Sequence, residues 1–405
     1  MTIHVPENAT APRPSEWSPA LDETFGSAHA DYAELRKTNG FPWSSDFGGF
    51  WSALTYDDVT RIVQDDEGFI TSVQNVVPAV PRKSPRPPLH IDPPKHGEYR
   101  TAIDRVLRRS LLKEREGEFR EAARRGIREL LQNPSPDAVR DFAAPFVIDC
   151  FAILIGAPSE LMNRVRDIGI RYSFAIQDMD AAVIAECSDQ LYDIARTIYR
   201  ERLEAGADPD TDMVASLQAA ADDPTNSITS ESALATLRQL IVAGMGAPQA
   251  VIASSIVHLA MDQDLQTHLR QNLDEMPAAA EEFLRMHAPY RVFSRTATKD
   301  TQIHGRTVRA GEAVALIYPS ANRDETVYDN PDEFVLRRAG NAHLTFGRGA
   351  HKCPAANMGR MEVAIALEEL LNATEQFTLD GEVQMMNWLE YGPKAVPLSL
   401  SPARG

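Results

Sequence analysis

The sequence predicts a mainly α-helical protein with a small β region, folded as a single large domain. Apolar residues recur at helical spacing through most of the stretch 97–287, and Pro, Gly and Asp clusters divide that stretch into separate helices. After Pro289 the pattern changes to short β-like runs separated by turn residues. The chain has 405 residues, enough to bury a sizeable core.

Composition narrows the class of protein. The chain carries 41 Lys and Arg against 58 Asp and Glu, a formal net charge of −17, which argues against general nucleic-acid binding. Its 3 cysteines form no CxxC pair, so neither a disulfide framework nor a common zinc site is expected. The first 17 residues are polar and proline-rich and do not resemble a secretory signal. We therefore expect a soluble, cytoplasmic protein with no nucleic-acid or membrane partner.

The organisation along the chain follows from these patterns. Residues 1–30 are predicted to form a loose N-terminal arm, and residues 31–405 the folded domain. The proline-rich stretch 70–95 is predicted to be a long loop, and loops of that length inside a compact domain tend to be functional. The other predicted elements are a helix from 31, a strand over 50–56, helices over 57–66, 97–132, 141–156, 160–178, 180–205, 210–221, 230–273 and 277–287, β runs over 291–318, a loop-rich stretch over 319–352, a helix over 358–372 and short C-terminal strands.

The stretch 239–260 is nearly uncharged and long enough to suggest a membrane span. However, Gly244, Gly246, Pro248, Gln249 and His258 interrupt it. Polar and helix-breaking residues of this kind favour a buried core helix.

The run FGRGAHKC ends at Cys353, where a helix is predicted to begin. Gly347 and Gly349 permit a tight loop, and Pro354 suits the first helical turn. The helix N-terminus, with His351 and Lys352 beside it, would favour a thiolate. Cys353 is therefore either a metal ligand or nucleophile, or simply a small buried apolar residue. Because the chain has no CxxCH, it does not attach a c-type haem.

The pattern Phe346-x-x-Gly349-x-His351-x-Cys353 resembles the haem-binding loop of the cytochrome P450 superfamily. Three further segments match in the order that the family requires. They are Glu282-x-x-Arg285, which resembles the ExxR pair, the segment 321–338, which would complete that pair with Arg338, and DPPKHGEYR (92–100), with His96 and Arg100 four residues apart. The resemblance covers the chain from about residue 30 to its end and implies the cytochrome P450 fold, one large domain around a buried haem.

The resemblance also implies roles for these residues. Cys353 would be the axial ligand of the iron of haem b, in a loop that begins at Phe346. A second set would bind the haem propionates: His96, Arg100, Arg295 and His351. Glu282, Arg285 and Arg338 would form a buried structural ion pair without a catalytic role. The family usually has glycine where this chain has Ala355, and we expect no loss of haem from that change.

The long helix departs from the family pattern at the oxygen-activating signature. In AGMGAPQA (243–250), Gly246 stands at the acid position and Ala247 at the threonine position. Neither side chain can deliver a proton. Pro248 should kink the helix. Gln249 is the nearest polar side chain. It is either a candidate catalytic residue or an ordinary polar residue of the helix. Three accounts stay open: a relay through water or substrate hydroxyls, the use of peroxide, or chemistry without ordinary dioxygen cleavage.

The resemblance implies a pocket for a small apolar or aromatic substrate, built from five segments. Its candidate residues are Val76, Val77, Phe174, Val242, Met245, Val292, Phe293 and Leu389. Electrons would come from an external ferredoxin and its reductase, which would dock on Lys352 and the basic run from Arg105 to Arg128. The expected function is a monooxygenase that hydroxylates or O-dealkylates its substrate. A hydrogen-peroxide-driven peroxygenase or oxidase, and a non-catalytic haem protein that binds a ligand, are the alternatives.

Overall fold

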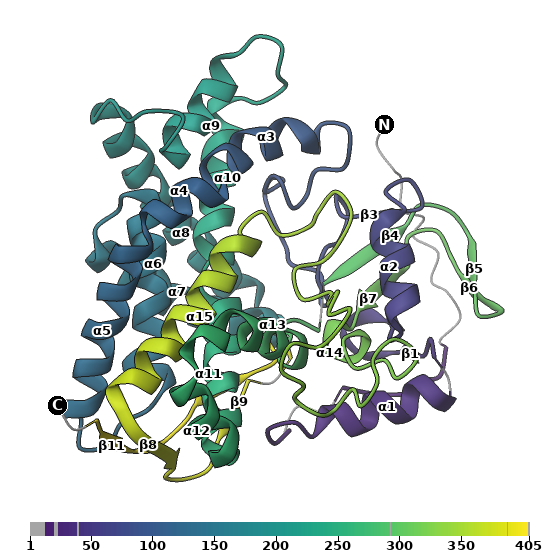
Figure 1. The fold of residues 1–405 in the computed structure, drawn as a ribbon. Helices are drawn as coiled ribbons and strands as arrows, with labels where there is room; N and C mark the ends of the chain where they lie inside the picture. Colours follow the sequence, from purple (N-terminus) through teal and green to yellow (C-terminus); the bar gives the residue numbers. More distant parts are fainter. Residues whose placement is uncertain (1–12, 20–22, 39, 292, 387, 404–405) are drawn as a thin grey trace.

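The computed structural model describes residues 13–19, 23–38, 40–291, 293–386 and 388–403 (Figure 1). Helices dominate, as the sequence predicts. In chain order they are α1 (Ala28–Thr38), α2 (Tyr56–Gln64), α3 (His96–Val106), α4 (Arg109–Glu114), α5 (Glu116–Gln132), α6 (Ala144–Ile155), α7 (Ser159–Gln177), α8 (Ala181–Glu204), α9 (Met213–Asp222), α10 (Ser230–Ala243), α11 (Gly246–Met261), α12 (Gln263–Gln271), α13 (Met276–Met286), α14 (Tyr318–Ala321) and α15 (Ala356–Ala373).

The strands are short and gather in one small sheet and three two-stranded ladders. The sheet has the order β1-β2-β7-β4-β3, in which β2 and β7 run parallel. The other pairs are β5 with β6, β8 with β11, and β9 with β10. Their bounds are β1 (Trp43–Ser44), β2 (Phe50–Ala53), β3 (Phe69–Ile70), β4 (Ser294–Ala297), β5 (Thr301–Ile303), β6 (Arg306–Val308), β7 (Ala313–Leu316), β8 (Thr374–Leu379), β9 (Gln384–Met385), β10 (Pro393–Ala395) and β11 (Leu398–Pro402).

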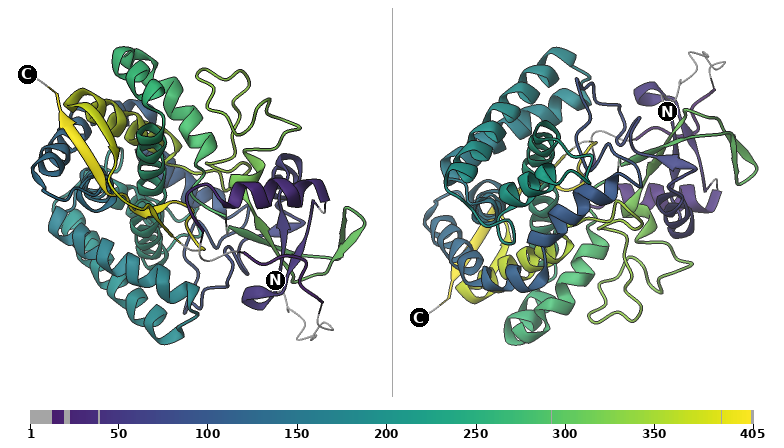
Figure 2. Two further views of the ribbon diagram at one scale, coloured as in Figure 1. Left: turned by 90° about the horizontal axis from the view of Figure 1, so that it is seen from below. Right: turned by 90° about the horizontal axis from the view of Figure 1, so that it is seen from above.

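The sheet lies at one side of the molecule and the helices at the other (Figure 1). Views from below and above place α11 near the middle, between the outer helices and the sheet (Figure 2). Helix α11 packs against α15, α13 and α6, and the residues it buries belong to the largest apolar core. The predicted mainly helical fold with a small β region is confirmed.

The long central helix is interrupted. Helix α10 ends at Ala243, Gly244 and Met245 lie outside regular helix, and α11 begins at Gly246. Pro248 therefore lies in the first turn of α11, where a missing N–H costs no internal hydrogen bond. Gly244 is also required for packing, because a Cβ there would lie 2.4 Å from the ring of Phe151. The sequence predicts a kink at this place, and the structure shows a two-residue interruption between α10 and α11.

Among the described residues, one helical run, Ser230–Met261, is long and apolar enough to cross a membrane. Within its most apolar window, 56% is buried inside the fold. The run packs against surrounding helices, as expected of a core helix.

Two predictions of organisation differ from the structure. The described residues 13–19 of the expected loose arm pack on the body, where Trp17 donates to Ser52 Oγ at 3.1 Å and contacts the ring of Trp388. Helix α1 starts at Ala28, inside that arm. The predicted helix 97–132 is three helices, α3 to α5, because Leu107 and Arg115 interrupt the hydrogen-bonded pattern. The predicted long loop after residue 70 is confirmed up to the start of α3.

Candidate active site

The loop before Cys353 is closed tightly by its own backbone. Gly347 and Gly349 have φ values of +66° and +70°, a region that favours glycine. A Cβ on Gly349 would lie 2.2 Å from the carbonyl oxygen of Val63, so only glycine fits there. The N–H of Cys353 donates to the carbonyl of Phe346 at 2.8 Å and closes the turn. The loop therefore fixes the backbone position of Cys353.

Helix α15 starts just after the cysteine, at Ala356 with Ala355 as its N-cap. The sequence predicts Pro354 in the first turn of this helix. That prediction is wrong, because Pro354 precedes the helix. Burial raises the pKa of the Cys353 thiol, while the backbone N–H of Ala355 and nearby arginines lower it in part. The predicted stabilisation of the thiolate is present but is smaller than the opposing effect of burial on the pKa. A buried thiol with a raised pKa is a poor free nucleophile but a good ligand, because metal binding itself removes the proton.

A metal held by Cys353 would need its other ligands from a cofactor. Among the residues that the structure describes, no three His, Cys, Asp or Glu side chains are grouped to hold a metal ion. One cysteine ligand suffices when a porphyrin supplies the remaining donors. The donor set of the protein therefore fits haem better than a bare ion.

Partly accessible residues occur on the two elements between which the resemblance places the cofactor. Cys353 on the loop is half-buried, and so are Tyr290 and Glu390. The first turn of α11, residues 246–249, is also only half-buried, although α11 runs through the middle of the fold (Figure 2). A haem held by Cys353 would cover such surface, so these segments fit a bound cofactor.

A cluster of cation-forming side chains borders this region. The rings of His96 and His351 lie 4.2 Å apart between centroids. Burial and nearby arginines lower the pKa of His96 to about 4 and of His351 to about 2. Arg295 is 6% exposed, and within the described part of the chain no carboxylate forms an ion pair with it. A buried cation such as Arg295 without a counter-ion is costly, and neutral His96 and His351 can still donate N–H, so the cluster fits a pair of anionic groups such as the two propionates.

Arg100 is used differently from the other predicted propionate partners. Its Nη1 donates to the carbonyl oxygens of Ala350 and Lys352, each at 2.8 Å. Its Nε and Nη2 donate to Asp104 one turn further along α3. Arg100 therefore ties α3 to the cysteine loop, and contact with a propionate stays a prediction for this residue.

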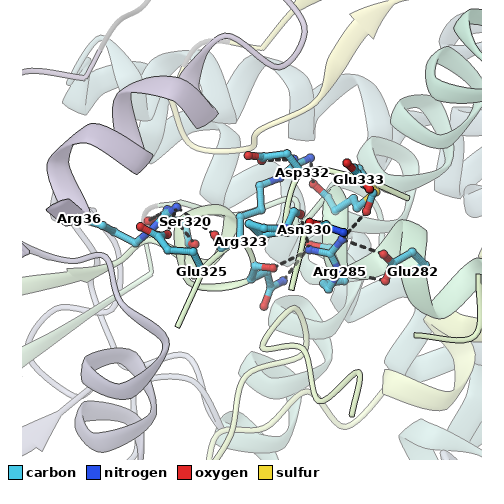
Figure 3. Close-up of polar contacts among 12 residues, drawn as sticks. Arg36, Glu282, Arg285, Ser320, Arg323, Glu325, Asn330, Asp332 and Glu333 are labelled. Atoms are coloured by element: carbon cyan, nitrogen blue, oxygen red, sulfur yellow. Dashed lines mark hydrogen bonds and ion pairs between the residues drawn. The ribbon is translucent and has the colours of Figure 1, made fainter. Parts of the chain in front are cut away.

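The predicted ion-pair residues form a fully connected buried network. Arg285 donates from Nε and Nη2 to the two oxygens of Glu282, at 2.9 and 2.8 Å, and both side chains are 0% exposed (Figure 3). Arg338 donates from Nε to the same carboxylate at 2.9 Å. Arg285 also donates to the carbonyls of Asn322 and Pro331. Asn322 in turn accepts from the N–H of Leu344 at 2.7 Å and donates to Oγ1 of Thr345 at 2.8 Å, so the network holds the segment that leads to Cys353.

The residues at the oxygen-activating position lie at the start of α11. Gly246 and Ala247 begin the helix, and Gln249 is half-buried with its N–H directed to the carbonyl of Met245 at 3.4 Å. Glu390, which the sequence does not single out, lies at the same place. A Cβ on Gly246 would lie 3.0 Å from Oε1 of Glu390, so a carboxyl group stands beside the position where the family's acid is absent. In the sequence, Glu390 is distinguished only as the one carboxylate in the otherwise uncharged run WLEYG (388–392).

The five predicted pocket segments converge. Val76 pairs with Phe293 in an isolated β-bridge, and Trp388 Nε1 donates to the carbonyl of Val77 at 2.8 Å. Met245 reaches α7, where its Cε lies 3.6 Å from the place of a Cβ on Gly169. The segments around α7, α11 and the C-terminal turn therefore enclose one region.

Individual pocket predictions fare unequally. Val76, Val242 and Phe293 are half-buried, which suits a cavity wall. Val77 and Leu389 instead pack in the second apolar core, together with Trp388 and Tyr172, and Met245 is 7% exposed. Phe174 is 45% exposed, because α7 turns Tyr172 and Ile176 inward and a residue two positions from each lies on another face. Val292 lies outside the described residues.

Comparisons with known proteins agree on one family. The family model for cytochrome P450 matches residues 174–388. A putative cytochrome P450 of Bacillus subtilis (strain 168), YjiB, is 28% identical over 352 residues, covering 85% of this chain and 87% of that protein. Nocardicin C N-oxygenase of Nocardia uniformis subsp. tsuyamanensis is 29% identical over 388 residues, covering 92% and 94%. The solved structure of cytochrome P450 CYP109Q5 from Chondromyces apiculatus has a TM-score of 0.82 at 25% identity, covering 94% of this chain and 96% of that chain.

A single cysteine on a glycine-rich loop, with buried His and Arg side chains nearby, has the donor chemistry that a haem-thiolate site requires. The chain belongs to the cytochrome P450 family. It is accordingly an oxidoreductase of the monooxygenase class, and its cofactor is haem b.

Proposed function

We propose that residues 31–405 form a monooxygenase domain that inserts one oxygen atom from dioxygen into a small apolar or aromatic substrate, by hydroxylation or O-dealkylation. The observation that carries this proposal is the convergence of mostly apolar segments near the start of α11, the helix that bears the oxygen-activating position. An apolar wall with few polar groups favours an apolar ligand and leaves orientation to those few groups.

The protein's own residues would have separate tasks. Cys353 would ligate the iron, and His96, His351 and Arg295 would hold the propionates. Haem, when bound, supplies electron transfer and dioxygen activation, which no side chain can provide. The chain around the site positions the substrate and excludes bulk water.

The electron donor is proposed to be an external ferredoxin. The basic run expected to bind it is largely neutralised: Arg120 and Arg124 pair with Glu369, Arg125 with Asp149 and Arg128 with Glu121. Arg109, Lys113 and Lys352 are exposed, and within the described chain no carboxylate pairs with them. We therefore narrow the proposed docking patch to these three residues.

Charge reversal of the patch should slow electron transfer. The double variant Arg109→Glu with Lys113→Glu is expected to lower the rate of reduction by a ferredoxin by roughly tenfold or more at low salt, because opposite charges steer association. The difference should shrink as ionic strength rises. Stopped-flow reduction with a ferredoxin measures it. Lys299→Glu, an exposed lysine between β4 and β5 on the sheet side, is the matched control (Figure 1). Equal rates for patch and control variants would refute this patch.

A peroxide-driven peroxygenase is the second candidate. The specific observation in its favour is that Gly246 and Ala247 occupy the acid and alcohol positions. An enzyme fed with peroxide receives oxygen that is already reduced and has less need of that pair.

Cytoplasmic localisation and the absence of membrane and nucleic-acid partners stay predictions.

A paired turnover assay tests the proposal. One arm contains ferredoxin, its reductase, NADH and dioxygen, and the other contains hydrogen peroxide alone. The substrates are a panel of terpenes, fatty acids and aromatic ethers. We expect product mainly in the first arm. Product mainly in the second arm would favour the peroxygenase, and Soret shifts on ligand addition without product in either arm would indicate a non-catalytic haem protein.

A further inference from the structure

We propose that Glu390, in the turn between β9 and β10, is the proton donor that replaces the missing acid of α11. The turn is clamped against one face of that helix. Oε1 of Glu390 lies 3.0 Å from the place of a Cβ on Gly246. One helical turn further, a Cβ on Gly392 would lie 2.8 Å from Cβ of Ala250. The carboxyl group therefore occupies the space that a side chain at position 246 would otherwise fill.

The backbone around Glu390 fixes this placement. Glu390 pairs with Tyr290 in an isolated antiparallel bridge, and the N–H of Tyr391 donates to the carbonyl of Pro289 at 2.6 Å. The N–H of Met386 donates to the carbonyl of Gly392 at 2.8 Å and closes the turn. Backbone hydrogen bonds of the residues next to Glu390 thus hold its carboxyl beside α11.

The surroundings of the carboxyl suit proton donation near neutral pH. Burial raises the pKa of Glu390 to about 7, against a small opposing effect of its own backbone N–H. Within the described chain, no basic side chain forms an ion pair with it. A carboxylic acid whose pKa lies near the working pH is the most effective general acid.

Tyr290 is the titratable neighbour across the bridge, and burial together with the charge of Glu390 raises the pKa of its phenol. The phenol therefore stays neutral and leaves Glu390 as the acid beside Gly246, at the position where the family's acid is absent.

The proton balance defines what Glu390 does. In monooxygenation, one dioxygen, one substrate C–H bond, two electrons and two protons give one hydroxylated product and one water. The electrons come from the external ferredoxin. Glu390 gives a proton that ends in the water molecule, becomes a carboxylate, and takes a proton back from solvent before the next turnover. When Glu390 does not deliver its proton, the two-electron-reduced oxygen takes two protons from water and leaves as hydrogen peroxide, and the substrate is not oxidised.

This inference rests on the proposed dioxygen-dependent function, and its test separates the two. Glu390→Gln keeps the shape and removes the acid. We expect product formation with ferredoxin and dioxygen to fall roughly 100-fold, and hydrogen peroxide release to rise, while reduction by ferredoxin and the carbon monoxide spectrum stay unchanged. Glu382→Gln, an exposed carboxylate close by in the sequence, is the matched control and should behave as wild type. If the wild-type protein forms no product with ferredoxin and dioxygen, that result refutes the proposed monooxygenase function. It does not refute the assignment of Glu390 as proton donor.

A second variant restores the acid from the helix side. Glu390→Ala empties the space beside position 246, and Gly246→Asp added to it places a carboxyl there. Gly246 has no positive φ, so a side chain causes no backbone strain. We expect Glu390→Ala to uncouple the enzyme and the double variant to regain much of the product yield. Uncoupling in both, with intact carbon monoxide spectra, would overturn the proposal.

A measurement without turnover gives an independent readout. The infrared spectrum of the ferric protein should contain a protonated carboxylic acid band that is lost in Glu390→Gln and fades as pH rises through about 7. The band fades as pH rises because the protonated acid predominates below the raised pKa of Glu390 and the carboxylate predominates above it. A carboxylate at all pH values would refute the donor role. Weaker substrate binding with unchanged peroxide release would show instead that Glu390 anchors a cationic substrate.

Discussion

Replacement of Cys353 by serine is expected to abolish the thiolate-type absorption of the reduced carbon monoxide complex and to lower monooxygenase turnover by at least about a thousandfold. The reason is electronic: a thiolate donates electron density that favours O–O cleavage, and a serine hydroxyl does not. The loop itself should survive, because its closing hydrogen bond joins the backbone of Cys353 to Phe346 and does not involve the sulfur. The measurement is the absorption spectrum after dithionite reduction under carbon monoxide.

The control for this variant is Cys187→Ser. Cys187 lies in α8, is 0% exposed and belongs to the second apolar core, so its substitution tests the general effect of placing a hydroxyl in a buried thiol site. We expect its carbon monoxide spectrum to match that of wild type. A thiolate-type spectrum retained by Cys353→Ser would show that another residue ligates the iron.

The second large effect is expected from Glu282→Ala. The variant leaves the guanidinium of Arg285 buried without its counter-ion and removes the partner of Arg338. Removing one partner of a buried ion pair costs about 3–5 kcal/mol of folding free energy, a large part of the 5–15 kcal/mol that typically stabilises a domain. Because the network also holds the segment before Cys353, haem content should fall with stability. Denaturant unfolding and the ratio of Soret to protein absorbance measure the two effects.

An exposed pair with similar geometry provides the control. Arg171 donates to both oxygens of Glu186 at 2.8 and 2.6 Å, but their side chains are 48% and 51% exposed. Glu186→Ala should leave the denaturation midpoint and haem content nearly unchanged, because water replaces the lost partner. Similar losses in both variants would mean that burial does not decide the strength of these pairs.

The features predicted well from the sequence are local. The spacing of Phe346, Gly349, His351 and Cys353 defines a loop whose shape depends on a few consecutive residues. Helical periodicity located α8 and α15 to within a few residues, because each buries a continuous apolar face. The network of Glu282 and Arg285 is local for the same reason, since the two side chains lie one turn apart.

The features that escaped prediction depend on contacts between distant segments. Glu390 and Gly246 are neighbours only after the C-terminal turn folds back on α11. The basic run looked like a free surface because the carboxylate of Glu369, which neutralises part of it, comes from α15 far along the chain. Phe174 was assigned to the pocket from the family resemblance, which indicates the segment but not which face of α7 the core covers.

Gly349 also bears on the order in which the chain can assemble. Its α-carbon fits against the backbone of Val63, at the end of α2, so the loop that carries Cys353 reaches its place only once this N-terminal helix is present. Contacts between residues so far apart in sequence form late, since the chain must first lose the entropy of closing the long segment between them. Acceptance of the cofactor is then a closing event of folding, and amide hydrogens near Val63 should gain protection from exchange when haem binds.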